Sequence, residues 1–144
     1  MTAAAPPNGP RRHRRDRGSL SIMLVVFVTV TLGGGALVVD GGRAMAARRH
    51  AANTAEAAAR RAVAEQSLTQ GFDPDVARAV ALDHAVRSGV DAGDVVVAIR
   101  TGPTGEAEVV VTITERRRAV FLALGGADEL SVRASGAATV VYAT

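Results

Sequence analysis

The sequence predicts an α+β fold in which a long N-terminal transmembrane helix extends into an exported domain with a small antiparallel sheet. Residues 18–39 carry no charge, and residues 43–66 are rich in alanine and contain neither glycine nor proline. Farther along the chain the hydrophobic period changes from about 3.6, typical of helices, to 2, typical of strands. These features divide the chain into a disordered basic cytoplasmic tip (1–17), a transmembrane helix (18–39), an Ala-rich helix continuing from the membrane (40–70) and a small exported α+β domain (71–144).

Residues 18–39 have the length and composition of a membrane span. About 20 apolar residues in a helix cross the hydrocarbon core of a bilayer. Because the backbone has no water to bind there, valine-rich segments also become helical. A cleaved secretory signal is the alternative, but its apolar core is usually about 7–15 residues long. A retained helix is therefore predicted.

The arginines at the N-terminus predict the orientation of this span. Five arginines and one aspartate lie within residues 11–17, ahead of the apolar segment. The positive-inside rule then favours a cytoplasmic N-terminus and an extracytoplasmic C-terminal domain of a single-pass protein in the cell membrane. Because the basic excess is confined to this tip, the composition does not indicate a nucleic-acid-binding protein.

Small residues form two candidate helix-packing surfaces. Gly33, Gly34 and Gly35 interrupt the span, and either a kink or close contact with a neighbouring helix would explain them. A stripe of alanines recurs every three or four residues and falls on one side of the following helix: Ala44, Ala47, Ala51, Ala55, Ala58 and Ala62. We expect the stripe to cover the sheet, since the domain from Gly71 onward is small, and we expect both surfaces to contact neighbouring chains.

The exported domain is predicted to contain two helices and three strands. A helix begins at Asp73-Pro74-Asp75, an acid and a proline suited to a first turn. Alternating apolar residues then indicate strands, and Gly102–Gly105 forms a turn between the first two. The predicted elements are a helix over 75–89, strands over 94–100 and 108–114, a short crossing helix over 116–125 and a last strand over 130–142.

Three short motifs occur in a characteristic order. They are Arg17-Gly18-Ser19 before the span, Asp40-Gly41-Gly42-Arg43 at the membrane exit, and the sequence ANTAEAAA over residues 52–59. In this order they resemble the TadE/TadG-like family of the Flp (tight adherence) pilus assembly system, over about residues 17–64. The resemblance implies a single-pass membrane component of a Flp/Tad-type pilus or related secretion machine, with a pilin-like exported domain. Its role would be that of a minor pilin-like or assembly protein acting through helix packing.

The same resemblance implies Gly18–Ser19 as a candidate processing site, because pilin-like precursors are cut after a glycine. Met23 stands at the fifth position of the resulting chain, where such precursors carry a glutamate. The chain therefore fits membrane-anchored members better than an ordinary filament subunit.

Reactive chemistry is not indicated by the side chains. The chain has no cysteine, and His13, His50 and His84 lack the spacing of metal ligands. We therefore assign no catalytic, cofactor-binding or metal-binding residue and no small-molecule substrate, and we predict that the protein is not an enzyme. The expected partners are the membrane and other pilus or secretion components.

Two charged groups and one alternative function complete the predictions. Asp40 and Arg43, three residues apart at the membrane exit, could pair and fix the depth of the helix. Arg116–Arg118 is interpreted as a solvated helix start or a partner contact. The alternative function is a membrane-tethered extracytoplasmic binding module, whose sheet would recognise a ligand while the helix serves only as a tether.

Overall fold

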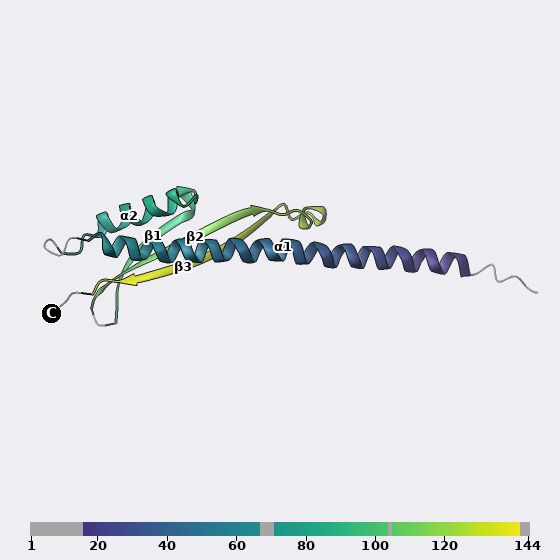
Figure 1. Cartoon of the computed structure of the whole chain (residues 1–144), viewed down its shortest axis with the longest axis horizontal. Helices are drawn as coiled ribbons and strands as arrows, with labels where there is room; N and C mark the ends of the chain where they lie inside the picture. The colour runs from purple at the N-terminus through teal and green to yellow at the C-terminus, as the bar shows by residue number, and fades with distance from the viewer. Residues whose placement is uncertain (1–15, 67–70, 104, 142–144) are drawn as a thin grey trace, which may run out of the picture. The chain divides into compact units, whose positions relative to one another are not determined.

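In a computed structural model, the described residues form a long helix, a short helix and a three-stranded sheet (Figure 1). Residues 16–66, 71–103 and 105–141 are described. Of the disordered tip predicted over 1–17, residues 1–15 lie outside them, and residues 16 and 17 begin helix α1 instead. Helix α1 spans Asp16–Ala64 and helix α2 spans Pro74–Arg87. The chain divides into two compact units, Met1–Gly35 and Ala36–Thr144. The predicted α+β class is confirmed.

The described part of the first unit is the N-terminal portion of α1. Its apolar side chains, Leu20 and Phe27 among them, are exposed, and Gly33–Gly35 remain helical. The most apolar 18-residue window of α1 has a mean hydropathy of 2.5, and none of it is buried within the chain. Among the described residues, α1 is the one helix long and apolar enough to cross a membrane.

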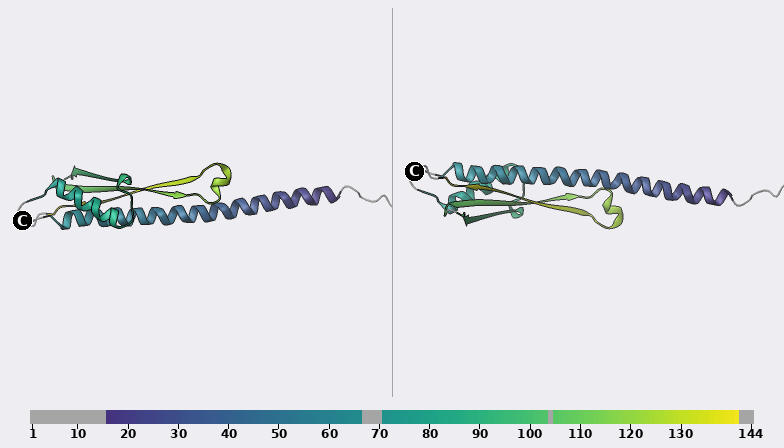
Figure 2. Two further views of the ribbon diagram at one scale, coloured as in Figure 1. Left: turned by 90° about the horizontal axis from the view of Figure 1, so that it is seen from above. Right: turned by 90° about the horizontal axis from the view of Figure 1, so that it is seen from below.

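The second unit contains an antiparallel sheet with the strand order β1-β2-β3 (Figure 2). Strand β1 spans Val95–Thr101, β2 spans Ala107–Arg118 and β3 spans Glu129–Thr139. Strand β2 pairs with both neighbours, with Val111 opposite Val97 on one side and Gly136 on the other. A short 3-10 turn, η1 (Ala92–Asp94), precedes β1.

The predicted crossing helix over 116–125 is wrong in most of its length. Arg116, Arg117 and Arg118 continue β2 and pair with β3, and only the 3-10 turn η2 (Leu122–Gly125) is helical. Cross-strand charge stabilises the extended conformation, because Arg116 forms ion pairs with Asp94 (2.6 Å) and Glu129 (3.5 Å). The last strand ends at Thr139, earlier than predicted.

Helix α1 also ends earlier than expected, at Ala64 instead of residue 70. The Gln66 side chain explains the end: its Nε2 donates to the Ala62 carbonyl (2.9 Å), and its Oε1 accepts from the Asp73 N–H (2.9 Å). Residues 67–70 lie outside the described part of the chain. The predicted start of α2 is confirmed, since the Asp73 carboxylate accepts hydrogen bonds from Asp75 N–H and Val76 N–H and caps the helix.

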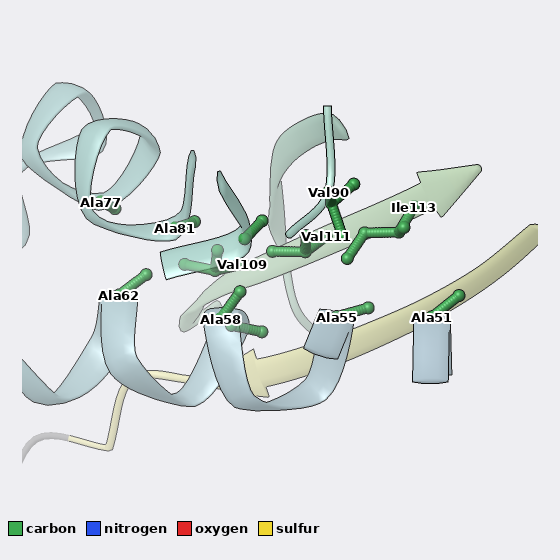
Figure 3. Packing of buried hydrophobic residues seen from close by; sticks show 12 residues of the cluster. Ala51, Ala55, Ala58, Ala62, Ala77, Ala81, Val90, Val109, Val111 and Ile113 are labelled. Carbon is green, nitrogen blue, oxygen red and sulfur yellow. The ribbon is translucent and has the colours of Figure 1, made fainter. Parts of the chain in front are cut away.

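The core is built from methyl groups on the helices and branched side chains on the sheet. The alanine stripe of α1 faces β2, where Val109, Val111 and Ile113 are fully buried (Figure 3). Helix α2 adds Ala77, Ala81 and Ala85, and Val90 fills the end of the cluster. The expectation that the stripe covers the sheet is therefore confirmed.

Strand β3 approaches α1 closely at Gly136. A Cβ atom added there would lie 2.3 Å from the backbone nitrogen of Glu56 and 2.6 Å from the carbonyl carbon of Ala55. Real Cβ atoms do not come that close to backbone atoms. The flanking inward residues of β3 are Ala134 and Ala138, which are also small. Helix and strand can therefore pack at this distance only with small residues on both sides.

We predict that Gly136→Ala destabilises the second unit. The added methyl group meets the backbone of α1, so helix and strand must separate, at a cost of at least about 1–3 kcal/mol. Thermal unfolding of the full chain in detergent, followed by circular dichroism, measures the effect. Gly42→Ala is the control, because a Cβ added at residue 42 has no atom of another segment within 4 Å. This variant should not be destabilised, since alanine is more favourable than glycine in a helix by about 1 kcal/mol. Equal melting temperatures for Gly136→Ala and the wild type would contradict the packing described.

A second prediction concerns the fragment 71–144. Without α1 the sheet loses Ala51, Ala55, Ala58 and Ala62 from its core, so we expect this fragment to remain unfolded. A longer fragment, 36–144, contains the whole second unit and should unfold cooperatively in urea. Circular dichroism of both fragments makes the comparison. Cooperative unfolding of 71–144 at the same midpoint would show that α1 contributes nothing to the core.

Candidate functional site

Asp40 lies in α1 directly after the charge-free segment and is only 1% exposed. Its carboxylate accepts three backbone hydrogen bonds, from the N–H groups of Val120 (3.1 Å), Phe121 (2.9 Å) and Leu122 (2.8 Å). The bond from Leu122, helped by those from Val120 and Phe121, lowers the pKa of the carboxyl below its ordinary value of 3.8, against the effect of desolvation. The buried carboxylate is thus held in its ionised form.

These bonds attach the connection between β2 and β3 to α1. From here on, the tip means residues 119–128, the connection between these two strands, and not the N-terminal segment 1–17. Hydrogen bonds from Ala119 N–H to the Asp128 carbonyl (3.0 Å) and from Ala127 N–H to the Leu122 carbonyl (3.0 Å) close it. Gly126 has a φ of 88° at the end of η2, a conformation that favours glycine. Successive N–H groups at the start of the tip point toward one carboxylate, an arrangement typical of anion-binding backbone nests.

The predicted direct pair between Asp40 and Arg43 does not form. Arg43 attracts the carboxylate over a longer distance and contributes the smallest of the effects that lower its pKa. The tip satisfies the hydrogen-bonding capacity of Asp40 instead. Asp40 therefore fixes a position along α1 by binding another part of its own domain.

A second polar cluster lies at His50, about three helical turns after Asp40 along α1. Glu115 is 7% exposed and continues the inward face of β2 beyond Ile113. Its Oε1 pairs with Nδ1 of His50 on α1, and its Oε2 accepts from Nη2 of Arg117 (3.0 Å). His50 and Arg117 also line an open hollow of about 340 Å³, together with Arg43, Ala46 and Ala47. The cluster joins α1 to β2 and leaves arginines around the hollow.

This arrangement is suited to binding and to holding the domain together. The side chains around the hollow combine one engaged carboxylate with the guanidinium groups of Arg43 and Arg117, an arrangement suited to contact with an anion. In the described ranges, no group of three histidine, aspartate or glutamate residues could hold a metal ion.

The residues predicted for helix packing fall into two environments. Ala51, Ala55, Ala58 and Ala62 are buried against the chain's own sheet, Ala47 is buried beside the His50 hollow, and Ala44 is half-buried. A neighbouring chain would therefore have to contact other residues of α1. The glycines at 18, 33, 34, 35, 41 and 42 are exposed within the chain, and Ser19 is exposed in the first turns of α1.

Sequence reasoning missed the tip and the His50–Glu115–Arg117 cluster. The alternation Val109, Val111, Ile113 would place Glu115 on the buried face, a signal that was available. Assigning Arg116–Arg118 to a helix hid it. Nothing in the local sequence shows that Asp40 meets residues eighty positions away.

Comparison with known families identifies the segment that carries this geometry. Residues 18–65 match the model of the TadE/G-like Flp pilus assembly domain. This segment is TadE/G-like. The match, over about a third of the chain, confirms the resemblance seen in the motifs. No curated protein and no solved structure matches the chain.

The TadE/G-like segment corresponds almost residue for residue to the described helix α1, Asp16–Ala64. It therefore includes the apolar half of the helix, Asp40 and the alanine stripe. The match thus covers one helix whose N-terminal part is exposed and apolar and whose C-terminal part packs against the sheet.

We predict that Asp40→Asn lowers the melting temperature at neutral pH. Oδ1 of Asp40 accepts from Val120 N–H and Oδ2 accepts from the N–H groups of Phe121 and Leu122, whereas the amide has one acceptor oxygen and its NH2 group would face a backbone donor. The folded-state pKa of Asp40 is lowered, so its contribution is present above about pH 4 and is lost as the pH falls through the folded value. The difference between wild type and Asp40→Asn should therefore be constant at neutral pH and shrink in acid. Thermal melts in detergent across this pH range measure it.

Asp83→Asn is the control for this experiment, because Asp83 forms an exposed ion pair with Arg87 on α2. Such pairs contribute about 0–1 kcal/mol. A stability of Asp40→Asn equal to that of the wild type at neutral pH would contradict the role assigned to the carboxylate.

Proposed function

We propose that this protein is a retained single-pass membrane component of a Flp-type pilus or related secretion machine, with a cytoplasmic N-terminus and an extracytoplasmic second unit. In this proposal it acts as a minor pilin-like or assembly subunit through contacts of α1. It has no catalytic role, and its partners are the bilayer and other components of the machine.

The observation that carries the proposal is the position of the family match. The TadE/G-like segment is helix α1. This helix contains the candidate membrane span in its N-terminal part and contributes alanines to the core of the second unit in its C-terminal part. Its apolar N-terminal part is exposed along its whole circumference within the chain. In a bilayer, small residues let helices approach closely, so Gly33, Gly34 and Gly35 are the favoured contact with a neighbouring helix.

The alternative, a membrane-tethered binding module, is less well supported. A tether could be exchanged without affecting the module, whereas Ala51, Ala55 and Ala58 of α1 belong to the core of the second unit. The fragment comparison above distinguishes the two functions, because a true module would fold from residue 71 onward.

We predict that Gly34→Leu reduces co-purification of the protein with other pilus components from its native cells. The larger side chain prevents close approach of a neighbouring helix. The second unit remains unchanged, because a Cβ added at residue 34 would have no described atom within 4 Å apart from the neighbouring backbone of its own helix. Affinity purification from detergent-solubilised membranes, with quantitative mass spectrometry, measures the recovery. Val30→Leu is the matched control, since it enlarges an exposed residue of the same segment by one methylene.

Intact-mass measurement of the same preparation shows whether residues before Gly18 remain attached. Equal recovery of partners with Gly34→Leu and Val30→Leu would exclude the glycines as the contact. Absence of pilus components from the wild-type sample would count against the proposed function itself.

A further inference from the structure

The tip exposes three consecutive apolar side chains. Val120 is 45% exposed, Phe121 38% and Leu122 36%. The N–H groups of the same three residues are bound to Asp40, so the backbone is satisfied while the side chains face outward. An exposed apolar run of this kind on a small domain calls for a covering partner.

The position of Asp40 indicates what that partner is. Asp40 follows Val39, the last residue of the charge-free segment, and one residue advances a helix by only about 1.5 Å. Side chains of a helix tilt toward its N-terminus, so the carboxylate is directed toward the apolar segment. Because Phe121 and Leu122 bind this carboxylate directly, the tip lies at the level where the hydrocarbon ends if residues 18–39 cross a bilayer.

Two arginines lie next to the tip in the structure or the sequence. Arg43 lies one helical turn after Asp40, and Arg118 ends the strand that leads into the tip. No carboxylate in the described residues lies within 4.0 Å of either guanidinium. The acids nearby are largely engaged: Glu115 by His50 and Arg117, and Glu129 by Arg116, which leaves Asp128 as the opposing charge. Guanidinium groups bind phosphate oxygens well.

We propose that the tip is a membrane-interface anchor. Val120, Phe121 and Leu122 enter the boundary between headgroups and acyl chains, and Arg43 and Arg118 contact the phosphates of anionic phospholipids. Apolar side chains beside arginines are typical of segments that lie in this interface. The second unit thereby gains an attachment to the bilayer in addition to α1. The proposal rests on residues 18–39 being membrane-embedded, but not on any role in pilus assembly.

Tryptophan fluorescence tests the anchor, because the chain contains no tryptophan. Phe121→Trp, and Leu122→Trp as a second variant, are reconstituted as full chains in vesicles of phosphatidylcholine and phosphatidylglycerol, with and without brominated acyl chains. We expect blue-shifted emission and quenching by the brominated lipid. Val96→Trp is the matched control: it lies on β1, is 60% exposed, and should emit as a tryptophan in water without quenching.

Emission and quenching of both tip variants equal to those of Val96→Trp would overturn the proposal, and would instead favour another protein as the partner of the tip. Arg43→Gln tests the charge contribution. It should reduce quenching in vesicles with phosphatidylglycerol but not in pure phosphatidylcholine, whereas Arg100→Gln on β1 should have no effect. Arg43→Gln is combined with Phe121→Trp for this measurement. Equal quenching of Phe121→Trp with and without Arg43→Gln, in both lipid compositions, would exclude the phosphate contact.

Flotation of the vesicles separates this proposal from the proposed function. Protein that floats without quenching of the tip variants retains the span and lacks only the anchor. Protein that does not float overturns both. Because the vesicles contain no pilus component, quenching itself supports the anchor whatever the outcome of the co-purification.

Discussion

The second unit depends on the approach of α1 to β3 at Gly136. The two backbones are so close there that a Cβ atom on residue 136 would overlap the backbone of Ala55 and Glu56. This distance sets the residue types around it. The inward residues of β3 beside Gly136 are Ala134 and Ala138, and the facing residues of α1 are alanines. The largest fully buried apolar side chains, Val109, Val111 and Ile113, come from β2, the central strand. The helix contributes mainly methyl groups, which allow it to lie close to the sheet.

This construction explains why a helix of such low side-chain volume can cover a sheet. A methyl group buries little apolar area, so each alanine contributes less than a leucine would. Close packing compensates, because dispersion contacts with the sheet increase as the helix axis approaches it. The consequence is that α1 cannot be removed without removing five of the twelve buried residues of the core cluster. A helix with an apolar N-terminal half thus also forms the structural centre of the second unit.

The sequence was sufficient to predict the parts of the fold that depend on local patterns. The helical conformation of the charge-free segment, the burial of Ala47, Ala51 and Ala55 on one side of α1, and the Asp73-Pro74 helix start were predicted correctly from composition, periodicity and capping. The errors occurred where distant residues decide. Arg116–Arg118 has no strand pattern of its own and is held extended by β3 and by the ion pairs of Arg116. Asp40 was expected to pair with a local arginine, but backbone donors from residues 120–122 satisfy it. A pattern confined to a few residues cannot show either contact.

Asp40 connects the two roles of α1. A carboxylate next to an apolar segment would be costly to bury without partners, and three N–H donors provide them without a second charged side chain. These donors belong to the turn between β2 and β3, so the ionised group at the end of the apolar segment fixes the register of the sheet against the helix. The alanine contact at Gly136 allows helix and strand to approach but, being made of similar methyl groups, discriminates weakly between neighbouring registers. The directional bonds of Asp40 supply that discrimination, which makes the residue after the charge-free segment a determinant of how the sheet is placed on the C-terminal part of α1.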